Sequence, residues 1–283
     1  MSRKLRELIV RTVLLLAAMS SLVFLGGIIV VLFTQGLPIF SIVGIKDFLF
    51  GTNWYPTHEN AEFGILPMIF GSLIITAGAL LFAAPLGILS ALFIAEIAPF
   101  WLKETMKPII ELLAGIPSVV YGLFGALVIA PFVQKIFNLP TGLTAFSAAL
   151  ILGIMVLPTV TSVVEDALTS IPKEYREAAL AVGATKWETM TKIVLPAAAS
   201  GISTALILGI GRAIGETMAI LMVAGGSPRI VFSFLKPVRA MTSTIAAEMA
   251  ETVMGSNHYF ALFGIAIVLF IMTLGFNLVA ENI

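Results

Sequence analysis

The stretch FGILPMIFGSLIITAGALLFAAPLGILSALFIA, residues 63–95, contains no charged residue. A helix crosses the hydrocarbon core of a bilayer with about 20 apolar residues, so this run is longer than one span needs. Pro85 and Gly87 fall inside it, and we interpret it as one long helix over 64–94 that is kinked near the proline. A second charge-free run covers residues 12–45. These runs predict an all-α integral membrane protein.

Four further apolar stretches bring the expected number of transmembrane helices to six. The first span is expected to remain as an anchor, because its apolar run is too long for a cleaved signal peptide and no small-residue cleavage site follows it. No internal repeat is found, so residues 1–283 are expected to form a single transmembrane domain. The expected spans are 13–33, 64–94, 112–132, 143–164, 201–224 and 260–280.

The composition excludes several classes of protein. Hydrophobic residues make up 59% of the chain and charged residues 11%, against about 45–50% and about 25% in soluble domains, and the mean hydropathy is +1.07. The net charge of zero argues against a nucleic-acid partner. The chain has no cysteine, which excludes disulfides and thiolate metal sites. His58 and His258 are far apart in the sequence and are expected in exposed loops, so we expect neither a metal site nor a cofactor.

The positions of Lys and Arg predict the orientation in the membrane. With the N-terminus in the cytoplasm, ten of the 16 basic residues lie in cytoplasmic segments, five lie outside and Arg212 lies within a span. An even number of spans then places the C-terminus in the cytoplasm as well. The segment 225–259 becomes an extracytoplasmic loop, and its stretch from Thr244 to Val253 is expected to form a surface helix that lies outside the membrane.

The cytoplasmic segment 165–197 is expected to begin with a short amphipathic helix. Pro172 suits the first turn of a helix, and Gly183 suits the left-handed conformation that ends one. Between them, apolar side chains recur at i, i+3, i+4 and i+7, which indicates a stripe on one helical face. The stripe consists of Tyr175, Ala178, Ala179 and Val182.

A second short helix is expected after the glycine. Thr185 and Glu188 have the spacing of a capping box, in which each side chain serves a backbone amide of the first turn. Trp187, Met190 and Val194 form its apolar stripe. On periodicity alone, such a pair of helices is also typical of a segment that lies at the lipid interface.

The spacing within this segment resembles the EAA signature of ABC importer permeases. Glu177-Ala178-Ala179 is followed after three residues by Gly183 and after nine more by Ile193-x-Leu195-Pro196. The resemblance implies that 165–197 is the coupling loop that docks on the ATPase subunit. Ala178, Ala179 and Gly183 would allow close approach, and Glu177 would offer a charged hydrogen bond. The chain has no Gly-rich loop ending in Gly-Lys-Ser/Thr, so ATP hydrolysis is expected on a partner chain and this chain is not expected to be an enzyme.

Arg212 and Glu216 lie within the fifth expected span. Charges in a span are expensive, so both side chains are expected to face the bundle interior or a water-filled path. Their i, i+4 spacing allows an ion pair on one helical face. Such a pair either locks two helices together or offers a positive charge to an anion in the pathway, with Glu216 restraining the arginine.

Five stretches resemble permeases of the phosphate-specific transport (Pst) family, and four of them indicate the PstC type of subunit. The resemblance covers about residues 48–278 and is the source of the phosphate assignment, since the residues alone indicate only that an anion is plausible. The stretches are GRAIGETMA (211–219), VAGGSPR (223–229), ELLAGIPSVVYG (111–122), FGTNWYP (50–56) and EDAL (165–168), the first of which indicates the family without the subunit type.

The resemblance implies the type I ABC importer permease fold in the cell membrane, with a translocation pathway between two permease chains. The implied partners are a second permease subunit of the PstA type, two ATP-binding subunits, an extracytoplasmic phosphate-binding protein and phosphate itself. Arg212 and Glu216 are the candidate pathway residues. Gly115, Pro117 and Ser118 are weaker candidates for an irregular backbone along the pathway, because glycine and proline are frequent in membrane helices.

Four alternatives remain open. Sulfate, molybdate or another oxyanion fits Arg212 as well as phosphate does. A secondary transporter explains the spans and the charge pair, although such folds usually contain paired repeats. A membrane-embedded enzyme would need a cluster of catalytic polar residues at membrane depth, and only one charged pair is found. A subunit with mainly a sensing task would assemble in the same way.

Overall fold

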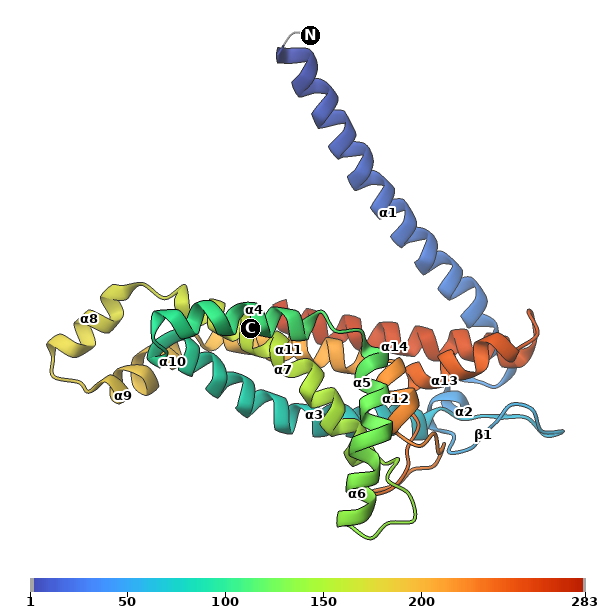
Figure 1. Ribbon diagram of the computed structural model, residues 1–283. Coiled ribbons are helices and arrows are strands. Elements are labelled where there is room, and N and C mark those ends of the chain that lie inside the picture. The colour runs from blue at the N-terminus through green and yellow to red at the C-terminus, as the bar shows by residue number, and fades with distance from the viewer. Residues whose placement is uncertain (1–2, 282–283) are drawn as a thin grey trace.

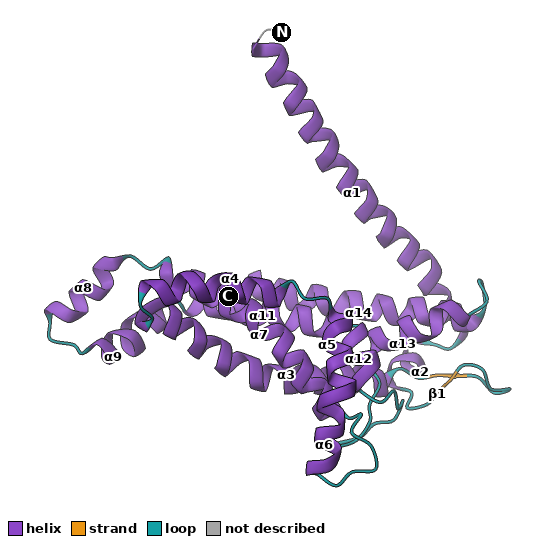
Figure 2. Ribbon diagram, viewed as in Figure 1, coloured by secondary structure: helices purple, strands orange, loops and turns teal. Residues whose placement is uncertain are grey.

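The structure confirms the helical membrane fold. It is a computed structural model that describes residues 3–281 (Figures 1 and 2). Five helices are long and apolar enough to cross a membrane, and a sixth candidate consists of two helices that meet at 66°. The single candidates for a membrane span are Ile9–Ile42, Leu66–Ile97, Ser118–Ile136, Ala145–Thr169 and Asn257–Val279, and the bent pair is Lys186–Ala197 with Ala199–Gly215.

Both termini are expected in the cytoplasm. They include Met1–Ser2 and Asn282–Ile283, which lie outside the described residues.

The described elements are helices apart from one hairpin of two short antiparallel strands. The first half contains α1 (Arg3–Ile42), α2 (Ile45–Phe50), β1 (Trp54–Tyr55), β2 (Glu62–Phe63), α3 (Leu66–Leu92), the π-helical turn η1 (Phe93–Ile97), α4 (Phe100–Ala114), α5 (Ser118–Phe124), the π-helical turn η2 (Gly125–Ile129) and α6 (Ala130–Ile136). The second half contains α7 (Ala145–Thr169), α8 (Lys173–Ala181), α9 (Lys186–Thr189), the π-helical turn η3 (Met190–Val194), α10 (Leu195–Ala197), α11 (Ala199–Gly215), α12 (Met218–Val223), α13 (Met241–Glu248), the 3-10 turn η4 (Met249–Glu251) and α14 (Asn257–Glu281).

Helices α3 and α7 form the centre of the bundle. Small residues allow them to approach closely, as is typical of helices in membranes. A Cβ placed on Gly87 would lie only 2.8 Å from Cγ1 of Val160, and one on Gly78 only 2.8 Å from Cβ of Ala149. The buried core along this contact is aliphatic and includes Ile75, Ala79, Ala83, Leu152, Val156 and Val160.

Helix α1 leaves the bundle at an angle (Figure 1). Its C-terminal part packs on α14, where the ring of Phe33 meets Phe270 edge-on and Gly36 lies against the carbonyl of Phe263. No residue of its most apolar 18-residue window is buried within the chain. Most of this helix therefore has to be covered by lipid or by another protein.

The two loop regions lie at opposite ends of the bundle. Helices α8 and α9 lie at one end, and the β1–β2 hairpin and α13 lie toward the other (Figure 1). In the hairpin, Trp54 pairs with Phe63 and Tyr55 with Glu62. A second core at that end surrounds Phe48, Trp54, Met68 and Leu262. The long helices α3, α11 and α14 connect the two ends.

The span expected over 112–132 is divided in the structure. Helix α4 ends at Ala114, and α5 begins only at Ser118. Pro117 lacks an N–H and disfavours a helical conformation of the residue before it, so the chain turns before it enters the apolar segment Ser118–Ile136. The span expected over 112–132 is therefore not one helix, and the irregular backbone that Gly115 and Pro117 suggested is present.

Two expectations for the segment 225–259 are corrected. The helix expected on the surface over 244–253 begins earlier, at Met241, and its first turn is buried. The amide of Met241 donates to Ser72 Oγ of α3 at 3.0 Å, which draws this turn into the bundle. His258 was expected in an exposed loop, but it lies in the first turn of α14 with its side chain 16% exposed. Its Nε2 lies 2.8 Å from a carboxylate oxygen of Glu248, which explains its position.

The close approach at Gly71 of α3 gives a test of this packing. A Cβ there would overlap the carbonyl oxygen of Arg239. We expect Gly71→Ala to lower the free energy of unfolding by about 1–3 kcal/mol, as overpacking typically does. Thermal unfolding of the purified protein in detergent, followed by circular dichroism, measures the change.

Gly275→Ala in α14 is the matched control, because a Cβ at Gly275 has no atom within 4 Å. Replacing a helical glycine by alanine in open space is expected to be neutral or to stabilise by up to about 1 kcal/mol. Equal unfolding midpoints for the two variants would contradict the packing described for Gly71.

Candidate functional site

The segment expected to couple to an ATPase consists of the helices α8 and α9. Pro172 precedes the first turn of α8, and Gly183 has a φ of +86°, so the predicted glycine junction is confirmed. Among the four predicted contact residues, Ala179 is buried against the bundle, while Glu177, Ala178 and Gly183 are exposed. The structure thus places three of the four on the outer surface of this loop.

The predicted capping box at the start of α9 is present. Thr185 Oγ1 accepts a hydrogen bond from the amide of Glu188 at 3.2 Å, and the amide of Thr185 donates to the Glu188 carboxylate at 3.0 Å. This amide, then Lys192 and the Thr185 hydroxyl, lower the pKa of Glu188 to about 2. The stabilisation from the ionised carboxylate is therefore complete above its ordinary pKa of about 4.3 and is lost as the pH falls toward about 2.

Large apolar side chains project from this loop into solvent. Val182 is 86% exposed, Trp187 63% and Tyr175 54%. Exposed aromatic and aliphatic groups that gather on one surface are typical of protein contacts. We call Tyr175, Val182 and Trp187 the loop surface. The sequence stripes located these residues, but only the structure shows that they face outward.

The ion pair on one helical face that the spacing of Arg212 and Glu216 allows is not formed. Helix α11 ends at Gly215, and Glu216 has an extended backbone with φ −68° and ψ 131°. In the part of the chain that the structure describes, no ion pair joins the two residues. The Glu216 carboxylate instead accepts from the amide of Ala219 at 3.1 Å, which is a donor left unpaired at the start of α12. Glu216 therefore serves the broken helix, and its carbonyl accepts from Thr242 Oγ1 at 2.7 Å.

Arg212 extends from α11 to the break between α4 and α5. Its Nη2 donates to the carbonyl oxygen of Ala114 at 3.3 Å, and the hydroxyl of Tyr121 donates to the carbonyl of Leu113 at 2.9 Å. Arg212, which is 98 positions away, and Tyr121, which is eight positions away, thus satisfy the last carbonyls of α4, where a positive charge also favours the helix dipole. Tyr121 was not among the predicted site residues, although a tyrosine hydroxyl in an apolar span needs a partner.

The guanidinium of Arg212 remains exposed in the isolated chain. It lies on a face of α11 that also exposes Thr204, Leu208 and Gly215. Lipid is a poor environment for a guanidinium, so this face has to lie against another protein or a water-filled path.

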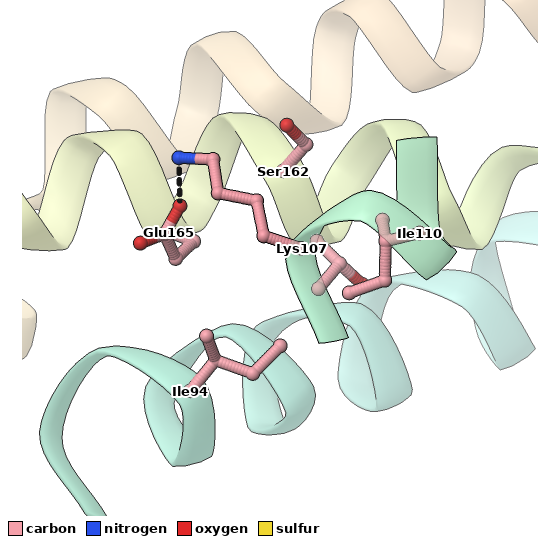
Figure 3. A pocket seen from close by; sticks show the side chains of 6 residues that line it. Ile94, Lys107, Ile110, Ser162 and Glu165 are labelled. Carbon is pink, nitrogen blue, oxygen red and sulfur yellow. Dashed lines mark hydrogen bonds and ion pairs between the residues drawn. The ribbon is translucent and has the colours of Figure 1, made fainter. Parts of the chain in front are cut away.

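A second charged cluster joins α4 to α7 (Figure 3). Lys107 Nζ lies 2.8 Å from a Glu165 oxygen and 3.0 Å from an Asp166 oxygen. The hydrogen bonds that Lys107 donates to Glu165 and then to Asp166 raise the pKa of Lys107, which keeps the ammonium charged. Ile94 and Ile110 line the small pocket beside the pair. From the sequence, Lys107 contributes only to the predicted orientation in the membrane. Its ion-pair partners could not be predicted, because they are about 60 residues away along the chain.

The capping box gives a local test of the loop. Thr185→Ala removes the acceptor of the Glu188 amide, and loss of such a cap typically destabilises a helix start by about 1 kcal/mol, or about fivefold in its opening equilibrium. We expect amide hydrogen exchange at 186–189 to rise by about this factor. Thr191→Ala is the control, because the Thr191 hydroxyl only donates to the carbonyl of Trp187. An equal rise in both variants would contradict the cap.

Comparisons with known proteins agree with this architecture. The chain is 39% identical over 268 residues to the probable ABC transporter permease protein YqgH of Bacillus subtilis, covering 94% of this chain and 84% of the relative. It is 37% identical to the phosphate transport system permease protein PstC of Mesorhizobium japonicum, covering 91% and 83%. The predicted resemblance to PstC-type permeases is therefore confirmed.

The fold and the family are shown by two further matches. A permease chain of the bacterial alginate ABC transporter, solved with an alginate-bound periplasmic protein, has the same fold with a TM-score of 0.68 at 21% identity, covering 98% of this chain and 94% of that one. The family described as "Binding-protein-dependent transport system inner membrane component" matches residues 83–283. The chain belongs to this family of inner membrane transport components.

Proposed function

We propose that this chain is a permease subunit of an ATP-driven importer of inorganic phosphate and forms half of the translocation pathway. The observation that carries the proposal is Arg212, a charged side chain exposed on the face of a membrane helix and directed to a broken helix. In the described chain, the bond to Ala114 uses one of the five N–H groups of its guanidinium. The remaining donors suit a tetrahedral oxyanion, because the planar guanidinium donates twice to such a group. Phosphate itself is suggested by the relatives named for phosphate transport.

The exposed face of α11 is the proposed contact with a second protein chain. We propose a homologous permease subunit of the PstA type there, so that the pathway lies between the two chains. Glu216 is the second proposed pathway residue, because its carboxylate lies at the break between α11 and α12. The Gly115–Pro117 turn follows Ala114, whose carbonyl accepts the hydrogen bond from Arg212.

The energy for transport is proposed to come from two ATP-binding subunits, one on the coupling loop of each permease. In this chain the loop is 165–197, and its loop surface is the contact. Glu177, Ala178 and Gly183 are exposed in the same loop, whereas Ala179 is buried. Closure of the ATPase around ATP would draw the two coupling loops together and open the pathway outward, and hydrolysis would reset it.

The remaining partner is an extracytoplasmic phosphate-binding protein. We propose that it docks on the end of the bundle opposite α8 and α9, which includes the segment 225–259 (Figure 1). This places both termini in the cytoplasm and 165–197 on the same side, in agreement with the distribution of basic residues.

Labelling of single cysteines tests this orientation, since the natural chain contains no cysteine. Val182→Cys and Met254→Cys replace side chains that are 86% and 84% exposed at opposite ends of the bundle. In right-side-out vesicles, a membrane-impermeant maleimide is expected to label Met254→Cys and to spare Val182→Cys. Inverted vesicles serve as the control and should give the opposite pattern. Labelling of Val182→Cys from outside would contradict the orientation.

Transport by the reconstituted complex tests the function. We expect ATP-dependent uptake of labelled phosphate that excess sulfate does not inhibit. Arg212→Ala should reduce uptake by about tenfold or more, because hydrogen bonds to charged groups contribute about 1.5–3 kcal/mol each. Arg212→Lys should retain part of the activity, since it keeps the charge without the planar fork.

Lys135→Ala is the control for loss of one positive charge, because Lys135 is exposed at the end of α6. Uptake that survives Arg212→Ala in an assembled complex would reduce Arg212 to a structural cap of α4. Inhibition by sulfate or molybdate would indicate another oxyanion as substrate. An intact complex that transports no oxyanion would contradict the proposed function.

A further inference from the structure

Helix α8 is held to the bundle by one arginine, Arg176. Its Nη2 and Nε lie 2.6 and 3.0 Å from Glu96 Oε1, and Nε lies 3.3 Å from Oε2. The side chains are only 21% and 13% exposed. Such a two-pronged contact between guanidinium and carboxylate is geometrically specific. It joins two residues that are 80 positions apart in the chain.

The same guanidinium also binds the end of α7. Nη2 donates to the carbonyl oxygen of Leu168 and Nη1 to that of Ile171, both at 2.9 Å. Carbonyls at a helix end have no partner within the helix and are favoured by a nearby positive charge. Arg176 therefore joins three elements at one point: α8, the end of α7 and the end of α3.

Glu96 is part of a backbone that is itself fixed. It lies in the π-helical turn η1, a type of turn that is often found at functional sites. Lys103 of α4 donates to the carbonyl of Ala95 at 2.5 Å, and the amide of Ala98 donates to the carbonyl of Phe93 at 2.8 Å. The Glu96 carboxylate therefore projects from a turn between α3 and α4 whose backbone is fixed by these hydrogen bonds.

Apolar packing contributes little to the attachment of α8. Ala179 is its one buried residue. A cavity of about 280 Å³ separates α8 and α9 from η1 and is lined in part by Ile97, Leu180 and Met190. The ion pair of Glu188 with Lys192, which begins in α9, is an exposed i, i+4 pair that anchors nothing beyond its own turn of the chain.

We infer that Arg176 is a positioning residue for energy coupling, which makes α8 move as one body with the cytoplasmic ends of α3 and α7. The inference rests on the proposed function, in which α8 is the coupling helix. Because α3 and α7 form the centre of the bundle, displacement of α8 by the ATPase would reach the pathway through this contact. If the contact of Arg176 with Glu96 is lost, the ATPase would still displace α8, but the bundle would move less than α8 does.

The test measures ATP hydrolysis and phosphate uptake in the same proteoliposomes that contain the complete complex. We expect Arg176→Gln to lower the ratio of phosphate transported to ATP hydrolysed by about tenfold, while hydrolysis changes much less. Glu96→Gln should act in the same direction. Arg176→Lys should restore part of the ratio, because it keeps the charge but reaches fewer of the acceptors. Lys192→Gln removes a charge from the exposed pair and should change the ratio less than twofold.

Spin labels at Glu174→Cys in α8 and Phe100→Cys at the start of α4 give a readout that does not depend on transport. Double electron–electron resonance on the complex should show a narrow distribution of the distance between the two labels. Arg176→Gln and Glu96→Gln should broaden this distribution. An unchanged ratio and an unchanged distribution would overturn the inference, and so would an equal loss of hydrolysis and uptake. If Arg176→Gln fails to assemble, Glu96→Gln decides by the same criteria. A wild-type complex that transports no phosphate would refute the proposed function, while the distance measurement would still decide the role of Arg176.

Discussion

Each backbone N–H and C=O that a helix leaves unpaired at membrane depth needs a partner within the protein, because hydrocarbon offers none. This constraint explains the side chains found at two breaks, one between α4 and α5 and one between α11 and α12. At the end of α4, Arg212 and Tyr121 supply donors to two carbonyls. At the start of α12, Glu216 supplies an acceptor to an amide, and Thr242 donates to the Glu216 carbonyl. Arg212, Tyr121 and Glu216 are therefore tied to these breaks, and the guanidinium of Arg212 is both held at a break and exposed.

The same environment decides how the helices pack. Without a hydrophobic driving force between helices in lipid, close van der Waals contact has to hold them together, and the small residues between α3 and α7 provide it. Gly78 and Gly87 leave room for Ala149 and Val160 of the facing helix. Helix α1 lacks such a contact along most of its length and stands away from the bundle (Figure 1). The rigid centre and the uncovered first helix fit a subunit that is completed by lipid and a partner chain.

Outside the apolar region, charged contacts take over the task of joining elements. Lys107 joins α4 to α7, and Arg176 joins α8 to the ends of α3 and α7. Of the two contacts, only that of Arg176 with Glu96 is largely shielded from solvent, with side chains 21% and 13% exposed. Half-buried ion pairs with several hydrogen bonds are geometrically demanding, which makes them suited to transmit a displacement from a surface helix into packed spans. Exposed pairs such as Glu188 with Lys192 are not suited to this task.

Local chemistry made much of the protein predictable from the sequence. Charge-free runs of sufficient length locate most of the spans, and the capping box and Gly183 were correct because a cap and a left-handed glycine depend on neighbours within a few residues. The spacing of Arg212 and Glu216 could not decide whether they pair, because the i, i+4 rule presumes a continuous helix and the end of α11 depends on partners from α12 and α13. The contacts of Arg212 with Ala114 and of Arg176 with Glu96 join residues 98 and 80 positions apart. The sequence by itself determined which segments enter the membrane and how α8 and α9 begin and end. Only the tertiary structure decided the partners of the charged side chains. The reason is that these partners depend on how the helices pack and not on the spacing of the residues along the chain.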